Sequence, residues 1–201
     1  MNKSSRLVCG IGFNSSMYPT TVGAKKLEEY TVWQSMLLRC TKKCWDRQPA
    51  YTGATCSENF KSYEYFYEWC QEQTGFGLSD ERGRKWQLDK DILIKGNKHY
   101  SEDACVFVPQ SINLLFNRGS VSRGKYPVGV TKCILKNKYI SQCCNEREIR
   151  YLGYFDTEEE AFNKYKAYKE GVIKYVANDY KASIDPRAYQ ALMQYEVNID
   201  D

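Results

Sequence analysis

The clearest structural pattern in the chain is carried by residues 86–116, which read WQLDKDILIKGNKHYSEDACVFVPQSINLLF. Apolar-flanked charges at 88–91 and alternating residues at 105–108 are each typical of a short strand. A Gly-Asn pair between them predicts a turn. Pro109 stands where a helix would begin, because proline is favoured at the first helical position. The stretch therefore predicts a strand, a loop, a second strand and a helix, in that order.

This stretch resembles the HNH-type homing endonucleases of phages and mobile elements, whose ββα-metal finger has the same order of elements. The resemblance is carried by Leu-Asp-Lys on the first strand, Gly-Asn and Tyr in the loop, Cys on the second strand, and Pro followed by a helical Asn. It places Asp89 and Asn113 at the metal-ligand positions. Oxygen ligands suit Mg²⁺, which retains waters and takes substrate phosphate oxygens as further ligands. The resemblance therefore implies Mg²⁺-dependent nicking of duplex DNA.

The residue that would activate water departs from the family pattern. Lys90 stands where most members have a histidine, and a lysine with an ordinary pKa is protonated at pH 7 and is a poor general base. His99, the one histidine in the chain, lies later, in the loop. Lys90 and His99 are therefore the candidate bases, and Lys90 has a second possible role in neutralising phosphate charge. The alternative for the whole stretch is a hairpin and helix without metal, in which Asp89 and Asp91 are solvated charges.

The composition is that of a globular protein. The chain has 201 residues, of which 27% are charged and 14% aromatic, so it can form one or two small domains with cores of their own. A formal net charge of +4 is too small to indicate a nucleic-acid partner by itself. The sequence contains no membrane-spanning run and no secretory signal, so we expect a cytoplasmic protein without a membrane partner. Both a monomer and a homodimer are compatible with these numbers.

Nine cysteines are many for this length, and in a reducing compartment they are expected as free thiols or metal ligands before disulfides. One close pair has the spacing C-x3-C. Four thiolates could close a tetrahedral structural Zn²⁺ site. The alternative is that the buried thiols behave as small apolar side chains. The candidate zinc ligands are Cys40, Cys56 and Cys105, followed by Cys44 and Cys9.

The region before residue 86 is predicted to be mainly helical. Residues 1–29 show little periodicity and are expected to form an irregular arm. Thr31 is predicted to cap a helix whose apolar residues recur at helical spacing. A second helix at 62–73 carries an aromatic stripe that is more typical of a core than of a base-stacking surface. The pattern W..ML.RC…Y.G…C extends the resemblance to HNH proteins over about residues 30–116.

Beyond residue 124 the periodicity changes from helical to alternating. Three short strands are predicted at 128–131, 138–144 and 150–155, joined by tight turns. A long helix follows, and Thr157 and Glu160 at its start have the spacing of a capping box. Asp185 and Pro186 then have the positions expected at the start of a last short helix.

These three strands and the long helix, with LGYFDTEEEAF at 152–162, resemble the DNA-binding domain of plant ethylene-response factors, which phage endonucleases often carry as a C-terminal module. In that family the outer face of the sheet lies in the major groove. The resemblance assigns DNA contact to Thr131, Gln142 and Tyr151. Cys144 and Ile149 replace family arginines, so base-specific reading is less expected, because Arg–guanine pairs are the commonest specific contact.

The charge of this region supports a DNA partner independently of the resemblance. Residues 121–155 contain seven basic and two acidic side chains, a formal net charge of +5. Gathered on one sheet, these side chains would form a phosphate-binding face. The alternative is an ordinary solvated face, whose lysines keep the edges of the sheet from pairing with another chain. The candidate phosphate contacts are Lys132, Lys136, Lys138, Arg147 and Arg150.

The sequence therefore predicts an α+β protein with an N-terminal helical region and ββα-metal finger, then a three-stranded antiparallel sheet packed on one helix. The predicted segments are an irregular arm at 1–29, an HNH-like domain at 30–117, a linker at 118–124, an ethylene-response-factor-like domain at 125–181 and a C-terminal helix within 182–201.

Three functions fit this organisation. The first is a phage-type, Mg²⁺-dependent endonuclease that nicks double-stranded DNA. The second is a nuclease-derived protein without catalysis, which binds DNA or a host protein and blocks a host defence or replication function. The third is a structural or partner-binding protein in which both modules have lost DNA.

Overall fold

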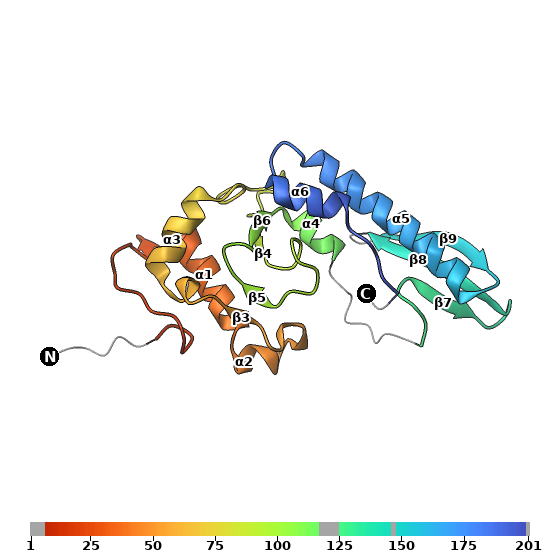
Figure 1. Cartoon of the computed structure of the whole chain (residues 1–201), viewed down its shortest axis with the longest axis horizontal. Helices are drawn as coiled ribbons and strands as arrows, with labels where there is room; N and C mark the ends of the chain where they lie inside the picture. The colour runs from red at the N-terminus through yellow and green to blue at the C-terminus, as the bar shows by residue number, and fades with distance from the viewer. Residues whose placement is uncertain (1–6, 117–124, 146–147, 200–201) are drawn as a thin grey trace. The chain divides into compact units, whose positions relative to one another are not determined.

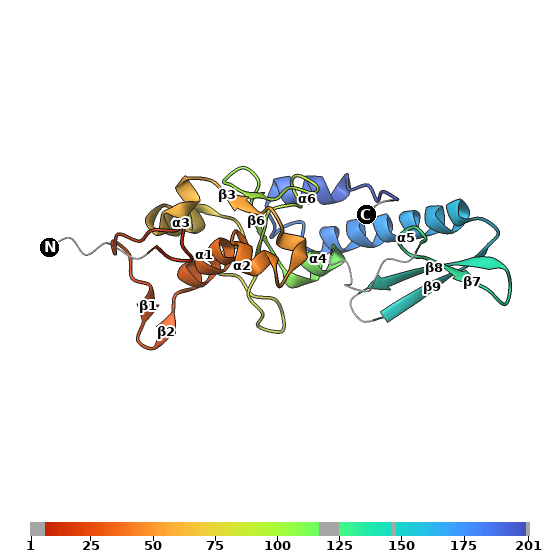
Figure 2. The ribbon, with the colours of Figure 1, turned by 90° about the horizontal axis from the view of Figure 1, so that it is seen from below.

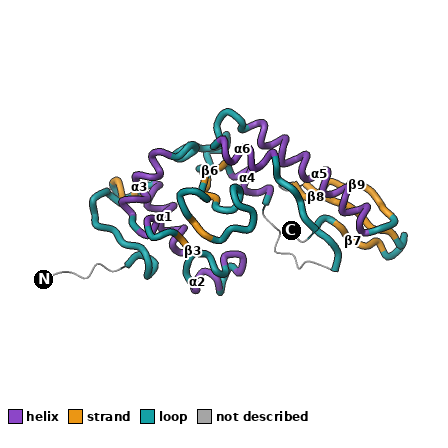
Figure 3. The backbone as a smooth tube through the Cα atoms, in the orientation of Figure 1, coloured by secondary structure: helices purple, strands orange, loops and turns teal. Residues whose placement is uncertain are grey.

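The computed structural model describes residues 7–116, 125–145 and 148–199 (Figure 1). The chain divides into two compact units, one made of residues 1–109 and 183–188 and the other of 110–182 and 189–201. Both units contain helices and strands, which confirms the mixed α and β character (Figure 3). The predicted linker at 118–124 lies outside the described ranges. No helix in the described part of the chain is long and apolar enough to cross a membrane.

The core of the first unit forms between α1 (Glu28–Arg39) and α3 (Tyr63–Glu72). The short helix α2 (Lys42–Trp45) and the 3₁₀ turns Pro49–Tyr51 and Asn59–Lys61 connect them. The aromatic stripe predicted on the second helix is core, as expected for apolar side chains repeating at helical spacing. Tyr63 and Phe66 of this stripe are fully buried, together with Trp33 of α1 and Phe60.

The start of α1 differs from the prediction. Leu27 occupies the N-cap position, and Thr31 lies inside the helix, where its hydroxyl donates to the Leu27 carbonyl at 2.9 Å. No side chain caps this end, but Glu28 and Glu29 in the first turn suit the positive end of the helix dipole. The predicted arm also contains regular structure, because β1 (Thr21–Val22) and β2 (Lys25–Lys26) form a small hairpin (Figure 2).

The two strands predicted within residues 86–116 are present and pair with each other. β4 (Gln87–Asp89) runs antiparallel to β6 (Val106–Val108), with Asp89 opposite Val106. Between them, β5 (His99–Tyr100) pairs in parallel with β3 (Thr55–Cys56), a pairing of two-residue strands too short to show a period in the sequence. After Pro109 the helix α4 (Gln110–Leu115) follows at the predicted place and is described with the second unit. The ββα finger as one compact body remains a prediction.

The second unit contains the predicted three-stranded sheet, in the order β7 (Val130–Cys133), β8 (Lys138–Asn145) and β9 (Glu148–Phe155), all antiparallel. The long helix α5 (Glu158–Asp179) packs along one face of this sheet (Figure 2). The capping box at its start is confirmed, since Thr157 and Glu160 each accept the other's backbone N–H. The last helix, α6 (Pro186–Met193), begins after Asp185 as predicted.

We expect Gly129→Ala to destabilise the protein by about 2–4 kcal/mol, from left-handed backbone strain together with overpacking. Gly129 has a φ of +74°, and a Cβ there would overlap the ring of Tyr165, which is buried between the sheet and α5. Gly171→Ala is the matched control, because nothing lies near its Cβ and it is inside α5, where alanine is favoured. Urea denaturation of both variants measures the difference, and equal stabilities would contradict the expected clash.

Candidate functional site

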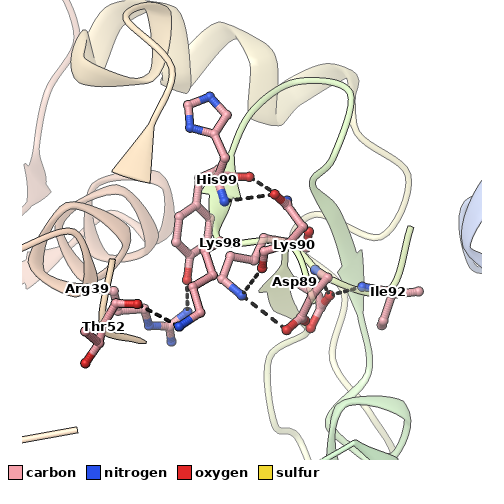
Figure 4. Close-up of polar contacts among 10 residues, drawn as sticks. Arg39, Thr52, Asp89, Lys90, Ile92, Lys98 and His99 are labelled. Carbon is pink, nitrogen blue, oxygen red and sulfur yellow. Dashed lines mark hydrogen bonds and ion pairs between the residues drawn. The ribbon is translucent and has the colours of Figure 1, made fainter. Parts of the chain in front are cut away.

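Two carboxylates lie together at the end of β4. Asp89, the last residue of the strand, is only 8% exposed, and its Oδ1 accepts the backbone N–H groups of Asp91 and Ile92 at 2.8 Å each (Figure 4). This tight turn brings the carboxyl groups of Asp89 and Asp91 within hydrogen-bonding reach of each other. The resemblance identified Asp89 as a ligand and gave Asp91 no role, and in the metal-free alternative both aspartates were solvated charges. The Asp-x-Asp spacing was the available signal that the second carboxylate belongs to the same site.

The environment of Asp89 favours a proton or a cation. Burial and, after it, the charge of Asp91 raise the pKa of Asp89 from 3.8 to about 6, while the two backbone hydrogen bonds oppose this shift. A hard cation bound by both carboxylates would remove their repulsion and replace the lost hydration with its own charge. The pair therefore fits Mg²⁺, with Asp89 held in place by the backbone and Asp91 as the more exposed partner.

Lys90 is placed as a hydrogen-bond donor. Its Nζ donates to the Asn97 carbonyl at 2.8 Å and forms an ion pair with Asp91 Oδ2 at 3.2 Å (Figure 4). The ammonium also lies 5.8 Å from the centre of the Tyr100 ring. The side chain of Asn97 in turn donates to the Lys90 carbonyl at 2.7 Å, which ties the loop to the strand end. An ammonium surrounded by acceptors favours the charge-neutralising role of Lys90 over the role of a base.

His99 is not brought to the carboxylates. It is exposed on β5, and its Nδ1 shares a hydrogen bond with the Thr55 hydroxyl at 2.8 Å. In Figure 4 its ring points away from Asp89 and Lys90. Asn113, the predicted amide ligand, is a half-buried residue of α4 in the second unit. Its pairing with Asp89 remains a prediction.

The cysteines ranked first as zinc ligands lie in one core. Cys40 and Cys56 share a hydrogen bond, and Cys105 belongs to the same buried cluster. That hydrogen bond lowers the pKa of Cys56 and raises the pKa of Cys40, while burial raises the pKa of Cys105 to about 12. Cys9 lies at the edge of this core, with its thiol 3.7 Å from the Gln34 carbonyl, and Cys44 is buried outside the cluster.

The described residues show no complete metal-ligand cluster around these groups. Within residues 7–116, 125–145 and 148–199, no three or more His, Cys, Asp or Glu side chains are gathered so as to hold a metal ion. All nine cysteines are free thiols. Structural zinc therefore stays a prediction from the sequence.

The second candidate surface is the outer face of the β7–β9 sheet, the face that does not carry the core shared with α5. Residues paired across strands share a face, and the face alternates along each strand. Thr131 pairs with Ile140, and Gln142 pairs with Tyr151. The register between β8 and β9 shifts between Ser141 and Gln142, but β8 keeps its alternation there, because Ser141 and Cys143 are both buried. Gln142 therefore shares the face of Ile140, and the three residues that the resemblance assigned to DNA lie on one face.

This outer face is aromatic and able to donate hydrogen bonds. The rings of Tyr151 and Tyr154 lie 5.5 Å apart, and the two residues are 50% and 40% exposed. The Lys136 ammonium lies 4.1 Å from the centre of the Tyr154 ring. Lys138 is on the same face by register and pairs with Asp156 at 3.0 Å. Phenol, amide, hydroxyl and ammonium groups are those that contact phosphates and base edges.

The predicted basic residues do not all share this face. Lys132 pairs with Tyr139, which packs against α5, and its ammonium lies 5.3 Å from the centre of that ring. Arg150 pairs with the buried Cys143, also on the α5 side. Arg147 lies outside the described residues. The alternation of the strands therefore divides the positive charge, and the outer face receives less of it than the segment as a whole carries.

Comparisons with known proteins add no relative. No protein-family model matches the sequence, and neither curated proteins nor solved structures give a significant match.

We expect Asp89→Asn to stabilise the metal-free protein by about 1–3 kcal/mol at neutral pH. The amide keeps an acceptor oxygen for the two backbone N–H groups and removes a buried charge beside Asp91. An acid whose pKa is raised by folding loses its contribution to stability as the pH rises through the folded value, here about 6. The gain should therefore vanish below the ordinary pKa of aspartate.

Urea denaturation in EDTA at acid and neutral pH measures this effect. Asp46→Asn, at an exposed carboxylate, is the control and should leave the free energy of unfolding unchanged. If Asp89→Asn is less stable than the wild type at neutral pH, the negative charges of Asp89 and Asp91 do not destabilise the fold.

Proposed function

We propose that this protein binds duplex DNA through the outer face of the β7–β9 sheet and nicks one strand with a divalent cation held at Asp89 and Asp91. The observation that carries the first part is the co-facial set Thr131, Gln142 and Tyr151. A face bearing these side chains and Lys136 can contact phosphates, and its tyrosines add apolar surface with a polar hydroxyl.

The carboxylate pair supports the proposed cleavage. Mg²⁺, when bound, supplies stabilisation of the charge that develops on the scissile phosphate and the leaving 3′ oxygen. Asp89 is already oriented by two backbone N–H groups, so little rearrangement is needed to bind a cation. Lys90 contributes positive charge beside the pair. Asn113 is proposed as a further ligand on the strength of the resemblance alone.

The second candidate function is DNA binding without catalysis. The hydrogen bonds that Lys90 already makes favour this candidate. The position of the family histidine holds an ammonium that already donates to Asn97 and Asp91. His99, the other candidate base, is hydrogen-bonded to Thr55, and its ring points away from Asp89 (Figure 4). Such a protein would act by occupying DNA or a host protein and blocking a defence or replication function.

Supercoiled plasmid incubated with the protein and Mg²⁺ or Mn²⁺ tests cleavage. We expect nicked circles with the wild type, a loss of roughly 100-fold or more in Asp89→Ala, and a gain in Lys90→His, which restores the family base. Lys43→Ala, at an exposed lysine of α2, is the control and should nick the plasmid as the wild type does. Plasmid binding without metal-dependent nicking in the wild type and in Lys90→His would overturn cleavage and leave the second candidate.

A titration of labelled duplex at several salt concentrations tests the binding face. Lys136→Ala should weaken binding and reduce the slope of log affinity against log salt by about 1, as expected for one lost phosphate contact. Lys174→Ala removes the same charge from an exposed position of α5, on the opposite side of the sheet, and should leave the slope unchanged. Equal effects of the two variants would indicate attraction by net charge and not a binding face.

A further inference from the structure

The turn that joins β7 to β8 presents two aliphatic side chains to solvent. Ile134 is 87% exposed and Leu135 is 98% exposed, the highest values among the large apolar side chains that the structure describes. The turn is closed by the Cys133–Lys138 pair and by the Asn137 N–H, which donates to the Ile134 carbonyl at 3.2 Å. Asn137 takes the left-handed conformation, with a φ of 49°, that such a tight turn requires. The two side chains are therefore held at the tip of a hairpin and do not belong to a core.

Positive charge surrounds this tip on both faces of the hairpin. Lys132 lies on the side of Tyr139, and Lys136 lies on the side of Tyr154. Lys138 closes the turn and has one carboxylate partner, Asp156. Residues 125–145 contain no aspartate or glutamate. An apolar tip between lysines complements a ligand with an apolar interior and anionic edges on both sides.

The tip is continuous with the proposed DNA face. Lys136, the residue directly after Leu135, lies over Tyr154, and Tyr154 contacts Tyr151 on the outer face. Duplex DNA has the matching chemistry, because its stacked bases lie between two rows of phosphates. Leucine and isoleucine are among the side chains that DNA-bending proteins insert between base pairs, unstacking a step and kinking the duplex.

We propose that Ile134 and Leu135 form an apolar wedge that inserts between adjacent base pairs when the outer face binds duplex DNA. This inference rests on the proposed DNA binding and adds to it a local distortion of the duplex. The lysines on either side hold the phosphates while the aliphatic side chains separate the bases. The wedge requires no particular sequence and favours steps that unstack easily.

Insertion between base pairs unwinds DNA, so relaxation of a closed circular plasmid tests the wedge. The plasmid is relaxed by a topoisomerase that needs no metal, in EDTA, with saturating full-length protein, and the topoisomers are then resolved on a gel. We expect the wild type to shift the distribution and the Ile134→Ser/Leu135→Ser variant to lose the shift at matched occupancy. Leu38→Ser, at an exposed leucine of α1, is the control and should retain it.

The outcomes separate the wedge from the binding face. A wild type that binds DNA through Lys136 but gives no shift, or a double variant that keeps the shift, overturns the wedge and leaves DNA binding intact. A wild type that does not bind DNA overturns both proposals. Flotation with vesicles of anionic phospholipid examines the competing partner, and binding to vesicles through Ile134 and Leu135, without the plasmid shift, also overturns the wedge.

Discussion

The candidate catalytic region depends on a buried carboxylate that the backbone holds at the end of a strand. Asp89 accepts two N–H groups from the turn that follows it, and this turn also places Asp91 beside it. Two acids in this position repel each other, and burial adds to the cost of their charge. Burial and this repulsion raise the pKa of Asp89, and the ammonium of Lys90 beside Asp91 offsets part of the repulsion. The local backbone thus brings together two carboxylates that are only two positions apart in the sequence.

The second unit depends on a different constraint, the alternation of side chains along paired strands. On one side Val130, Tyr139 and Cys143 pack against α5. On the other side Thr131, Gln142 and Tyr151 face outward, with Lys136 lying over Tyr154. The strand pairing therefore determines which polar groups are available to a partner, and it separates Lys132 and Arg150 from the outer face. Both proposed DNA contacts, the face and the hairpin tip, follow from this one register.

Much of the fold was predictable because the signals were local. The capping box of α5, the start of α6 and the strands on either side of the Lys136–Asn137 turn are encoded by neighbouring residues. The start of α1 was not predictable in this way, because Thr31 satisfies its hydroxyl inside the helix and the acidic Glu28 and Glu29 replace a side-chain cap. The β3–β5 pairing joins two-residue strands far apart in the chain, and so short a strand has no period.

The order of the elements, the apolar stripes of the helices and the acidic strand end that carries Asp89 all follow from neighbouring residues in the chain. Only the folded chain shows that His99 is hydrogen-bonded to Thr55 and that the basic residues of the sheet segment divide between two faces. Periodicity and capping act within a few residues of one another. Burial, pairing register and the direction of a side chain depend on groups that come together only after folding.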